Sequence, residues 1–328
     1  MTEPLSLPVF RKISRIVDGM GLRAYVIGGY VRDYYLCRPC TDIDVVVVGS
    51  GIDVAEALAR ETGSNVTVFK TFGTAMLRTE GMEVEFVGAR KESYSRDSRK
   101  PVVEAGTLRD DQLRRDFTIN ALAWSLNGDT FGELEDPFGG MEDMREHIIR
   151  TPCDPDITFS DDPLRMMRAV RFAAQLGFDI APETFEAIER NRERIRIVSR
   201  ERIITEINKI VLSPVPSIGF ELMDMTGLLP LVFPEMSRLK GVEKVGLHGH
   251  KDNFTHTLKV LDNVALNSDS LWLRWAAILH DIGKPATKAY DPAAGWTFHG
   301  HEVVGARMVP DIFRRMKLPL NDRMKYVR

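Results

Sequence analysis

The segment from Val26 to Val48 limits the possible folds of this chain more than any other part of its sequence. A short apolar run ends at Gly28-Gly29, a helical pattern follows, and a second apolar run opens with Asp42-Ile43-Asp44. Because residues i and i+2 of a strand point to the same face, Asp42 and Asp44 project side by side. The segment therefore predicts a strand, a helix and a second strand, with paired carboxylates at the start of the second strand.

The chemistry of these residues points to a phosphate and metal site. Two carboxylates held this close repel each other, and a divalent cation removes that cost. Hard oxygen ligands suit Mg²⁺, and a diglycine before a helix lets backbone N–H groups approach a phosphate chain. We therefore predict metal-assisted phosphoryl or nucleotidyl transfer, with Asp42 and Asp44 as Mg²⁺ ligands and Gly28, Gly29 and Arg32 at the phosphates. In the opposing interpretation, the acids merely line an exposed strand edge.

A third carboxylate commonly completes such a site, and the strand pattern of Val84–Val87 offers Glu85. We predict Glu85 as the third catalytic carboxylate. Glu83 would share its strand face and is the competing candidate.

A second motif is Arg114-Arg-Asp-Phe-Thr-Ile-Asn120, which we expect at a loop-to-helix junction. Asp116 and Asn120 would share one helical face, where they could bond a ribose hydroxyl. Together with Arg115 they are candidate nucleotide-binding residues. An ordinary capped helix is the alternative interpretation.

A third motif contains Asp162, Arg165 and Arg168, which form a polar stripe at i, i+3 and i+6 if the segment is helical. An aspartate beside an arginine offers an acceptor next to donors. That pattern matches the pairing edges of cytosine and adenine and rejects those of uracil and guanine, as in proteins that read a flipped base. The stripe is therefore a candidate nucleotide-binding site, and an intrahelical ion pair is the alternative.

A fourth motif combines His256 with the adjacent pair His280-Asp281 at the end of an apolar helix. This pattern predicts a divalent metal site, to which His301 or His299 could add a ligand. A vestigial site that only packs is the alternative.

Composition excludes several classes of protein. The chain of 328 residues is 44% hydrophobic and 28% charged, with a net charge of −3 and three cysteines. The N-terminus lacks the pattern of a signal peptide, and no apolar run approaches a membrane span, so we expect a cytoplasmic protein without membrane contact. Sparse cysteines argue against a disulfide framework, and the pair Cys37 and Cys40 gives only weak support to a redox or zinc site. Any nucleic-acid contact would depend on local basic segments, such as residues 90–115 and 190–209.

The pattern of elements predicts an α+β fold in which a head with a small mixed sheet is followed by all-helical regions. We expect domains at residues 1–150, 151–240 and 241–328. Residues 91–112 show little periodicity and read as a long functional loop. The chain ends within a helical pattern, so we expect the last domain to be truncated. Its oligomeric state stays unknown from the sequence.

In their order along the chain, these motifs resemble the bacterial tRNA nucleotidyltransferase and poly(A) polymerase family, which includes the CCA-adding enzymes. The resemblance covers about residues 22 to 235, and residues 253–305 resemble the HD domain of some members. The matching segments are Gly28–Asp33, Asp42–Asp44, Arg114–Ala121, Asp136–Gly140, Asp161–Arg165 and Arg200–Lys209. The family usually opens its base-reading motif with Glu-Asp, where this chain has Asp161-Asp162.

The resemblance implies a nucleotidyltransferase head, a helical neck that binds nucleotide and RNA, and an HD-type helical domain. It implies that Asp162 and Arg165 select CTP and then ATP, which are joined to a tRNA 3′ end by two-metal Mg²⁺ chemistry at Asp42 and Asp44. The stretch 91–112 resembles a flexible loop that members need for the terminal A, which favours full CCA addition. The late aspartate ligand expected of an HD domain has no clear counterpart in this chain.

Three other functions stay open at this stage. A poly(A) polymerase shares the head motifs, and use of CTP separates the two enzymes. The HD domain could instead be the main activity, as a metal-dependent phosphohydrolase of phosphorylated RNA ends. An RNA-binding protein with an inactive head is the third alternative, and the Asp42 and Asp44 pair counts against it.

Overall fold

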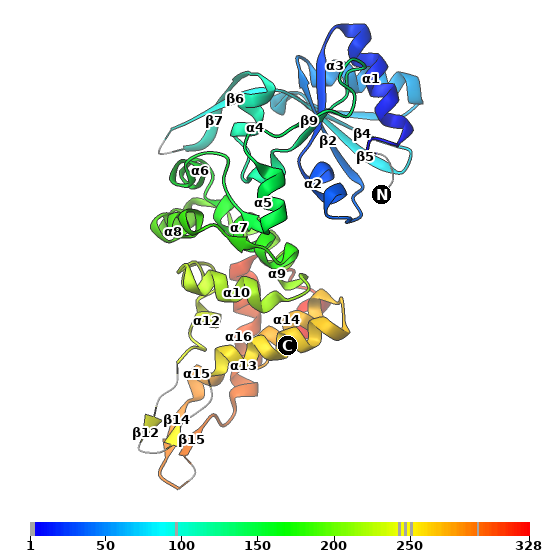
Figure 1. The fold of residues 1–328 in the computed structure, drawn as a ribbon. Helices are drawn as coiled ribbons and strands as arrows, with labels where there is room; N and C mark the ends of the chain where they lie inside the picture. Colours follow the sequence, from blue (N-terminus) through cyan, green and yellow to red (C-terminus); the bar gives the residue numbers. More distant parts are fainter. Residues whose placement is uncertain (1–3, 96–97, 242–243, 246–247, 250–251, 294) are drawn as a thin grey trace. The chain divides into compact units, whose positions relative to one another are not determined.

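The computed structural model describes residues 4–95, 98–241, 244–245, 248–249, 252–293 and 295–328. The chain divides into two compact units, Met1–Asp154 and Pro155–Arg328 (Figure 1). Within the described residues, no helix is long and apolar enough to cross a membrane. Cys37, Cys40 and Cys153 are free thiols.

The first unit is built on a seven-stranded mixed sheet with the order β3-β4-β5-β2-β1-β8-β9. The pair β2–β5 is parallel, and the other five neighbouring pairs are antiparallel. The strands of this sheet are β1 (Arg23–Ile27), β2 (Asp42–Val48), β3 (Val66–Phe69), β4 (Thr74–Thr79), β5 (Met82–Gly88), β8 (Ala123–Ser125) and β9 (Leu134–Glu135). The mixed sheet in an α+β unit agrees with the fold expected from the sequence.

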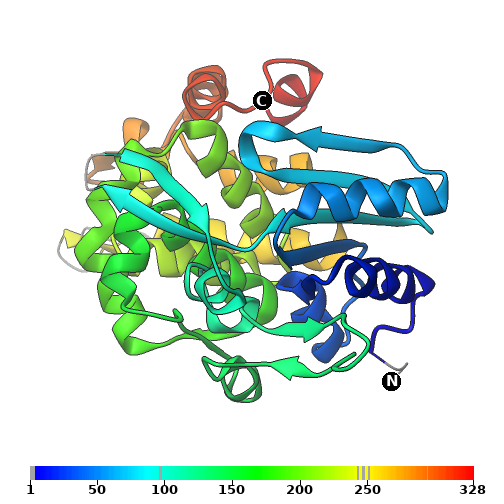
Figure 2. The same cartoon turned by 90° about the horizontal axis from the view of Figure 1, so that it is seen from above.

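The apolar run that follows Asp44 explains why β2 lies in the middle of this sheet. Ile43, Val45, Val46 and Val47 are each at most 1% exposed, so both faces of the strand are covered beyond its polar start. Strands buried on both faces read as continuous apolar runs. Helices α1 (Pro8–Met20) and α3 (Gly51–Thr62) pack together, and α3 packs on β4 and β5 (Figure 2).

The remaining elements of the first unit are short. They are α2 (Gly29–Tyr35), η1 (Lys70–Phe72), β6 (Arg90–Ser95), β7 (Ser98–Ala105), α4 (Leu108–Leu113), η2 (Thr118–Asn120), α5 (Gly140–Glu146) and β10 (Ile148–Ile149), where η marks a 3₁₀ helix. Helix α4 begins with a capping box, in which the Thr107 side chain accepts from Asp110 N and the Asp110 carboxylate accepts from Thr107 N.

The expectation of a loop over residues 91–112 was wrong. Strands β6 and β7 pair in an antiparallel hairpin, with an irregularity between Ser93 and Ser95, and α4 follows them. Hydrophobic alternation marks a strand only where one face is buried, whereas a ladder forms through backbone groups whatever the side chains are. A polar hairpin of this kind therefore leaves little periodicity in the sequence.

The second unit is mainly helical. Its elements are α6 (Pro155–Asp161), α7 (Leu164–Leu176), β11 (Asp179–Ile180), α8 (Pro182–Asn191), η3 (Arg192–Ile197), α9 (Arg200–Val211), α10 (Pro216–Met225), α11 (Leu229–Val232), α12 (Pro234–Ser237), β12 (Lys244–Val245), β13 (His248–Gly249), α13 (Asn253–Asn267), α14 (Leu271–Leu279), α15 (Lys284–Thr287), β14 (Ala289–Asp291), β15 (Gly295–Thr297), α16 (His301–Met316) and α17 (Asp322–Val327).

Helix α9 lies at the centre of this unit and contacts α7, α10, α14 and α16. Its buried residues Ile203, Ile207 and Ile210 recur at helical spacing and form its apolar face. The buried guanidinium of Arg274 in α14 donates to the carbonyl oxygens of Val211 and Ser213, at 2.8 and 2.9 Å. The bond to Val211 satisfies a carbonyl in the last turn of α9 that has no partner within the helix.

The third motif does not lie on one continuous helix. Helix α6 ends at Asp161 and α7 begins at Leu164, because a proline disfavours helical conformation in the residue before it. Asp162 therefore lies between two helices, and only Arg165 and Arg168 of the predicted stripe lie on α7. The Asp162 carboxylate accepts from Leu164 N at 3.2 Å, which is a local bond at the start of α7.

Candidate active site

The parallel pairing of β2 with β5 brings the predicted carboxylates onto neighbouring strands. In this register Asp42 is the partner of Glu83 and Asp44 is the partner of Glu85. Directly paired residues of neighbouring strands have Cβ atoms about 5 Å apart. Glu85 is thus next to Asp44, and Glu83 is next to Asp42.

Burial raises the pKa of Asp44, the nearby charge of Asp42 raises it further, and Arg115 opposes both effects. Burial also raises the pKa of Glu85, with a further contribution from the charge of Asp44. Burial is thus the main cause at both carboxylates, which leaves their negative charge poorly solvated at this edge of the sheet. A divalent cation held by these hard oxygen donors would balance it, so the donor set fits Mg²⁺.

Gly28 is the point on which several site residues converge. Its φ of 83° lies in the region that favours glycine. A Cβ atom there would stand 2.8 Å from Arg115 Nη1, 3.6 Å from Asp44 Oδ2 and 3.7 Å from Asn120 O. Asp44, Arg115 and Asn120 are thus brought together around the diglycine, and Gly29 begins α2 directly after it.

Arg32 is buried, and its guanidinium is engaged by protein groups. Nε and Nη2 donate to the carboxylate oxygens of Asp33, both at 2.9 Å, and Nη1 donates to Asn120 Oδ1 at 2.6 Å. Asp33 was not among the predicted site residues, although it follows Arg32 directly in the sequence. Here Arg32 ties α2 to the segment that carries Asn120.

The segment from Arg115 to Asn120 differs from the expected loop-to-helix junction. Helix α4 ends at Leu113, Phe117 has an extended backbone, and η2 spans Thr118–Asn120. Asp116 and Asn120 nevertheless lie side by side, because Asn120 Nδ2 donates to Asp116 Oδ1 at 3.0 Å, and both residues are buried. Asp116 thereby fixes the amide that Arg32 also contacts.

Helix α5, which follows this segment along the chain, also contacts it. The Asp136 carboxylate accepts from Gly140 N and Met141 N at 2.7 and 2.9 Å, which caps the helix. Thr118 Oγ1 donates to the buried Asp143 at 2.6 Å. These two aspartates hold η2 in place and explain the Asp136–Gly140 motif.

In the second unit, the three predicted nucleotide-binding residues lie near one another in the sequence but have different partners. Asp162 accepts from Arg202 of α9 at 2.8 Å, a partner that the sequence spacing did not indicate. Arg165 Nη1 lies 3.5 Å from the carbonyl oxygen of Thr158, and the Arg168 guanidinium lies 5.5 Å from the centre of the Phe172 ring. Arg202 keeps the carboxylate of Asp162 oriented from a neighbouring helix.

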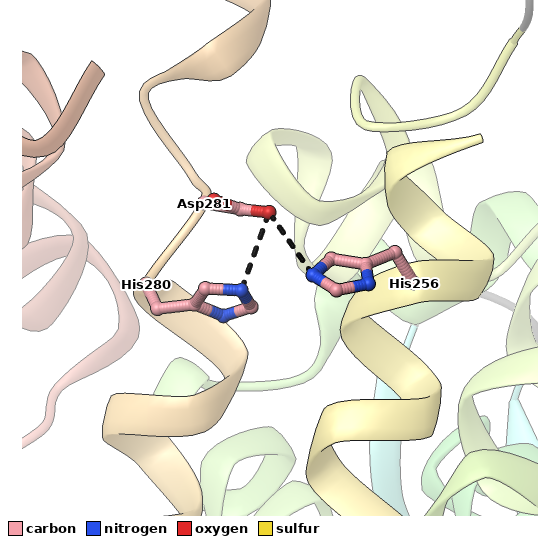
Figure 3. A group of neighbouring side chains, drawn as sticks. All are labelled: His256, His280 and Asp281. Carbon is pink, nitrogen blue, oxygen red and sulfur yellow. Dashed lines mark ion pairs between the residues drawn. The ribbon is translucent and has the colours of Figure 1, made fainter. Parts of the chain in front are cut away.

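The predicted histidine site is assembled in the second unit. His256 Nε2 and His280 Nε2 lie 3.6 and 3.2 Å from Asp281 Oδ2, and both rings point toward that oxygen (Figure 3). His301 Nε2 is 3.5 Å from Asp281 Oδ1. Metal bonds of about 2.1 Å place ligand atoms roughly 3.0–3.6 Å apart, so nitrogen and oxygen donors at these separations fit a divalent ion.

Lys284 also contacts the Asp281 carboxylate, with Nζ 2.6 Å from Oδ2. Burial alone would raise the pKa of Asp281, but hydrogen bonds from His280 and Lys284 lower it to about 2. Within the part of the chain that the structure describes, His256, His280 and Asp281 are the one group of three such side chains whose ligand atoms all lie within 4.8 Å of one another. The carboxylates Asp42, Asp44 and Glu85 are therefore less tightly grouped.

Three family models match the chain in sequence order. The "Poly A polymerase head domain" matches residues 24–150, the "Probable RNA and SrmB- binding site of polymerase A" matches residues 177–240, and the "HD domain" matches residues 253–327.

Similar proteins match over most of the chain. A "Multifunctional CCA protein" of Pseudomonas fluorescens is 36% identical over 311 residues, which cover 91% of this chain and 71% of that protein. An "A-adding tRNA nucleotidyltransferase" of Aquifex aeolicus is 43% identical over 188 residues, which cover 57% of this chain and 23% of that protein.

Two solved structures also have a similar fold. A "tRNA nucleotidyltransferase complexed with a primer tRNA and an incoming ATP analog" matches with a TM-score of 0.70 and 28% identity, over 96% of this chain and 82% of that one. A "CCA-adding enzyme with CTP" matches with a TM-score of 0.70 and 25% identity, over 99% of this chain and 70% of that one. With head, RNA-binding and HD models in order and a relative matched along most of its length, the chain belongs to the tRNA nucleotidyltransferase family that contains the CCA-adding enzymes.

Proposed function

We propose that this chain adds the sequence CCA to the 3′ end of tRNA from CTP and ATP. The observation that carries the proposal is the register that sets Asp44 beside Glu85, with Arg115 and the Gly28 backbone at the same place. Relatives named for CCA addition match along the chain, and similar structures hold a primer tRNA, an ATP analogue or CTP.

In the proposed reaction, the terminal ribose oxygen of the RNA attacks the α-phosphorus of the bound nucleotide. A new phosphodiester bond forms, the bond to the β-phosphate oxygen breaks, and pyrophosphate leaves. Asp42 and Asp44 would hold two Mg²⁺ ions with Glu85 beside them, and these ions would favour loss of the hydroxyl proton and neutralise the leaving group. The Gly28 and Gly29 backbone, with Arg115, would bind the triphosphate.

Base choice is assigned to Asp162 and Arg165. The carboxylate of Asp162 would accept from the exocyclic amino group of cytosine or adenine, and Arg165 would donate to the adjacent ring nitrogen. The bond from Arg202 would keep the carboxylate in its orientation. We assign residues 1–150 to catalysis, 151–240 to binding of nucleotide and RNA, and 241–328 to the HD-type domain.

The deciding experiment offers labelled CTP and ATP, separately and together, to a tRNA transcript that lacks its 3′ CCA, with Mg²⁺. Two C additions followed by one A are expected. Addition of A only to a transcript that already ends in CC would make the chain an A-adding enzyme, like its Aquifex relative. Repeated A addition without use of CTP would make it a poly(A) polymerase.

Two variants test the assigned residues. Asp44→Ala should abolish addition by both nucleotides while the protein stays folded, and retained activity would refute its role as metal ligand. Arg165→Ala should relax the preference for CTP and ATP over UTP and GTP. Unchanged selectivity in that variant would remove Arg165 from base choice.

A second candidate activity is favoured by the geometry of the HD site. The ligand atoms of His256, His280 and Asp281 lie within 4.8 Å of one another. We propose a metal-dependent phosphohydrolase there that acts on phosphorylated RNA ends. The test is phosphate release from a 3′-phosphorylated RNA with added Mn²⁺, which should be lost in His280→Ala. Equal release by that variant would refute the activity.

A further inference from the structure

A fully buried carboxylate lies next to the proposed phosphate site and has no role in the reaction described above. Asp111 in α4 is 0% exposed. Removing a carboxylate from water is costly unless it is paired with positive charge and hydrogen-bonded. A buried aspartate at this position therefore depends on the groups that it contacts.

The partners of Asp111 are the next two arginines along the chain. Arg114 Nε and Nη2 donate to Oδ1 at 2.9 and 2.5 Å, and Arg115 Nε donates to Oδ2 at 3.3 Å. Each carboxylate oxygen thus engages a different guanidinium. The two arginines follow Asp111 by three and four residues.

The far end of the Arg115 guanidinium lies at the diglycine. Its Nη1 atom is 3.5 Å from Asn120 O and 2.8 Å from the place of a Cβ on Gly28, a point that is 3.6 Å from Asp44 Oδ2. The charge of Arg115 also lowers the pKa of Asp44. Arg115 therefore spans from the buried carboxylate to the edge of the proposed catalytic site.

The other arginine near the diglycine is arranged differently. Arg32 directs Nε, Nη1 and Nη2 to Asp33 and Asn120. Its fork is therefore turned toward the protein. Arg115 directs Nε to Asp111, whereas its Nη1 lies at the glycine backbone, where a phosphate would approach.

We propose that Asp111 is a positioning residue that holds Arg115 against Gly28, so that this guanidinium binds the triphosphate of the incoming nucleotide beside Asp44. This role rests on the proposed nucleotidyl transfer, and it adds a positioning residue and separate roles for the two arginines. Arg115 would bind the phosphates, and Arg32 joins α2 to the segment of Asn120. Asp111 fixes the direction of the Arg115 side chain by accepting from its Nε.

The test is the affinity for CTP, measured by equilibrium dialysis with Mg²⁺, together with KM and kcat for CTP on the tRNA transcript. Loss of one charge-assisted hydrogen bond corresponds to roughly a tenfold or larger weakening. We expect Asp111→Asn to raise both Kd and KM for CTP by about tenfold, with a smaller change in kcat. Arg114→Ala is the matched control, because it removes the other partner of the same carboxylate, and its effect should stay within about twofold.

A double-mutant cycle separates positioning from a general structural role. Arg115→Ala alone should weaken CTP binding, and adding Asp111→Asn to that variant should cause little further loss. Asp111→Glu should restore part of the affinity. Additive losses, or equal losses in Arg114→Ala and Asp111→Asn, would overturn the proposal.

If the Asp111 variants do not fold, a pair of lysine variants tests the same proposal. Arg115→Lys keeps the charge but loses the fork, and it should weaken CTP binding well beyond the matched Arg114→Lys; equal binding by the two would overturn the proposal. Failure of the wild-type chain to transfer any nucleotide while it still binds CTP would refute the proposed function and leave the binding comparison intact.

Discussion

The buried ion pair between α7 and α9 gives the sharpest test of how the second unit is held together. Arg171 Nε donates to Glu206 Oε2 at 2.5 Å, and the two side chains are 8% and 5% exposed. Removing one partner of a buried pair costs about 3–5 kcal/mol. In Glu206→Gln the amide keeps an acceptor, and Arg171 keeps its bond to Gln175 and its place over the Phe172 ring. We therefore expect a loss of about 2–3 kcal/mol in the free energy of unfolding.

A loss of this size is measurable by calorimetry. For a unit of this size, each kcal/mol lowers Tm by about 2–4 °C, so Glu206→Gln should melt about 4–12 °C below wild type. The double variant Arg171→Met with Glu206→Met should recover most of the loss, because an apolar pair of similar volume leaves no charge unpaired. A Glu206→Gln transition within about 1 °C of wild type would refute the reasoning, as would a double variant no more stable than the single one.

Three further predictions follow from particular positions. Gly140→Ala should lower the free energy of unfolding by about 1–3 kcal/mol, because the new Cβ would stand 2.4 Å from the carbonyl oxygen of Thr118. Gly19→Ala in α1 is the control, because a Cβ there meets nothing within 4 Å. Equal urea midpoints for the two variants would contradict this prediction. Gly28→Ala should raise KM for CTP about tenfold or more, since its φ of 83° suits glycine; an unchanged KM would show that the backbone there adapts. His280→Ala should remove one bound Mn²⁺ per chain in equilibrium dialysis, and unchanged stoichiometry would place that ion elsewhere.

The elements that carry strong periodicity were predicted well. The strand, helix and second strand predicted between Val26 and Val48 are β1, α2 and β2, and the apolar helix predicted before His280-Asp281 is α14. Buried apolar faces determine these elements, and such faces are visible in the sequence. The pairing of Asp44 with Glu85 needed one more assumption, that the two strands are neighbours, and the register confirms that they are.

Other features could not be read from the chain because their causes lie far away in sequence. The hairpin β6–β7 forms through backbone hydrogen bonds, which leave no apolar pattern. Arg202 approaches Asp162 from 40 residues away, and Asn120 approaches Arg32 from 88 residues away. Sequence spacing identifies only residues that are neighbours within one helix or strand. It therefore paired Asp162 with Arg165 and did not predict the bond from Arg202. A signal that was present but not used is Asp111, an acid one helical turn before two arginines.

Four acids of the first unit fall into two groups that their partners distinguish. Asp33 and Asp111 each accept from arginine guanidinium groups within the fold, so their charge is already balanced. Asp44 and Glu85 have pKa values raised by burial and by neighbouring acids, with Arg115 and Arg90 only partly opposing them. An acid whose charge is not balanced in this way gains more from a bound cation, so the second group is where the Mg²⁺ of the proposed reaction would be held. The same residue type thus serves two purposes, and the arginines around it show which one.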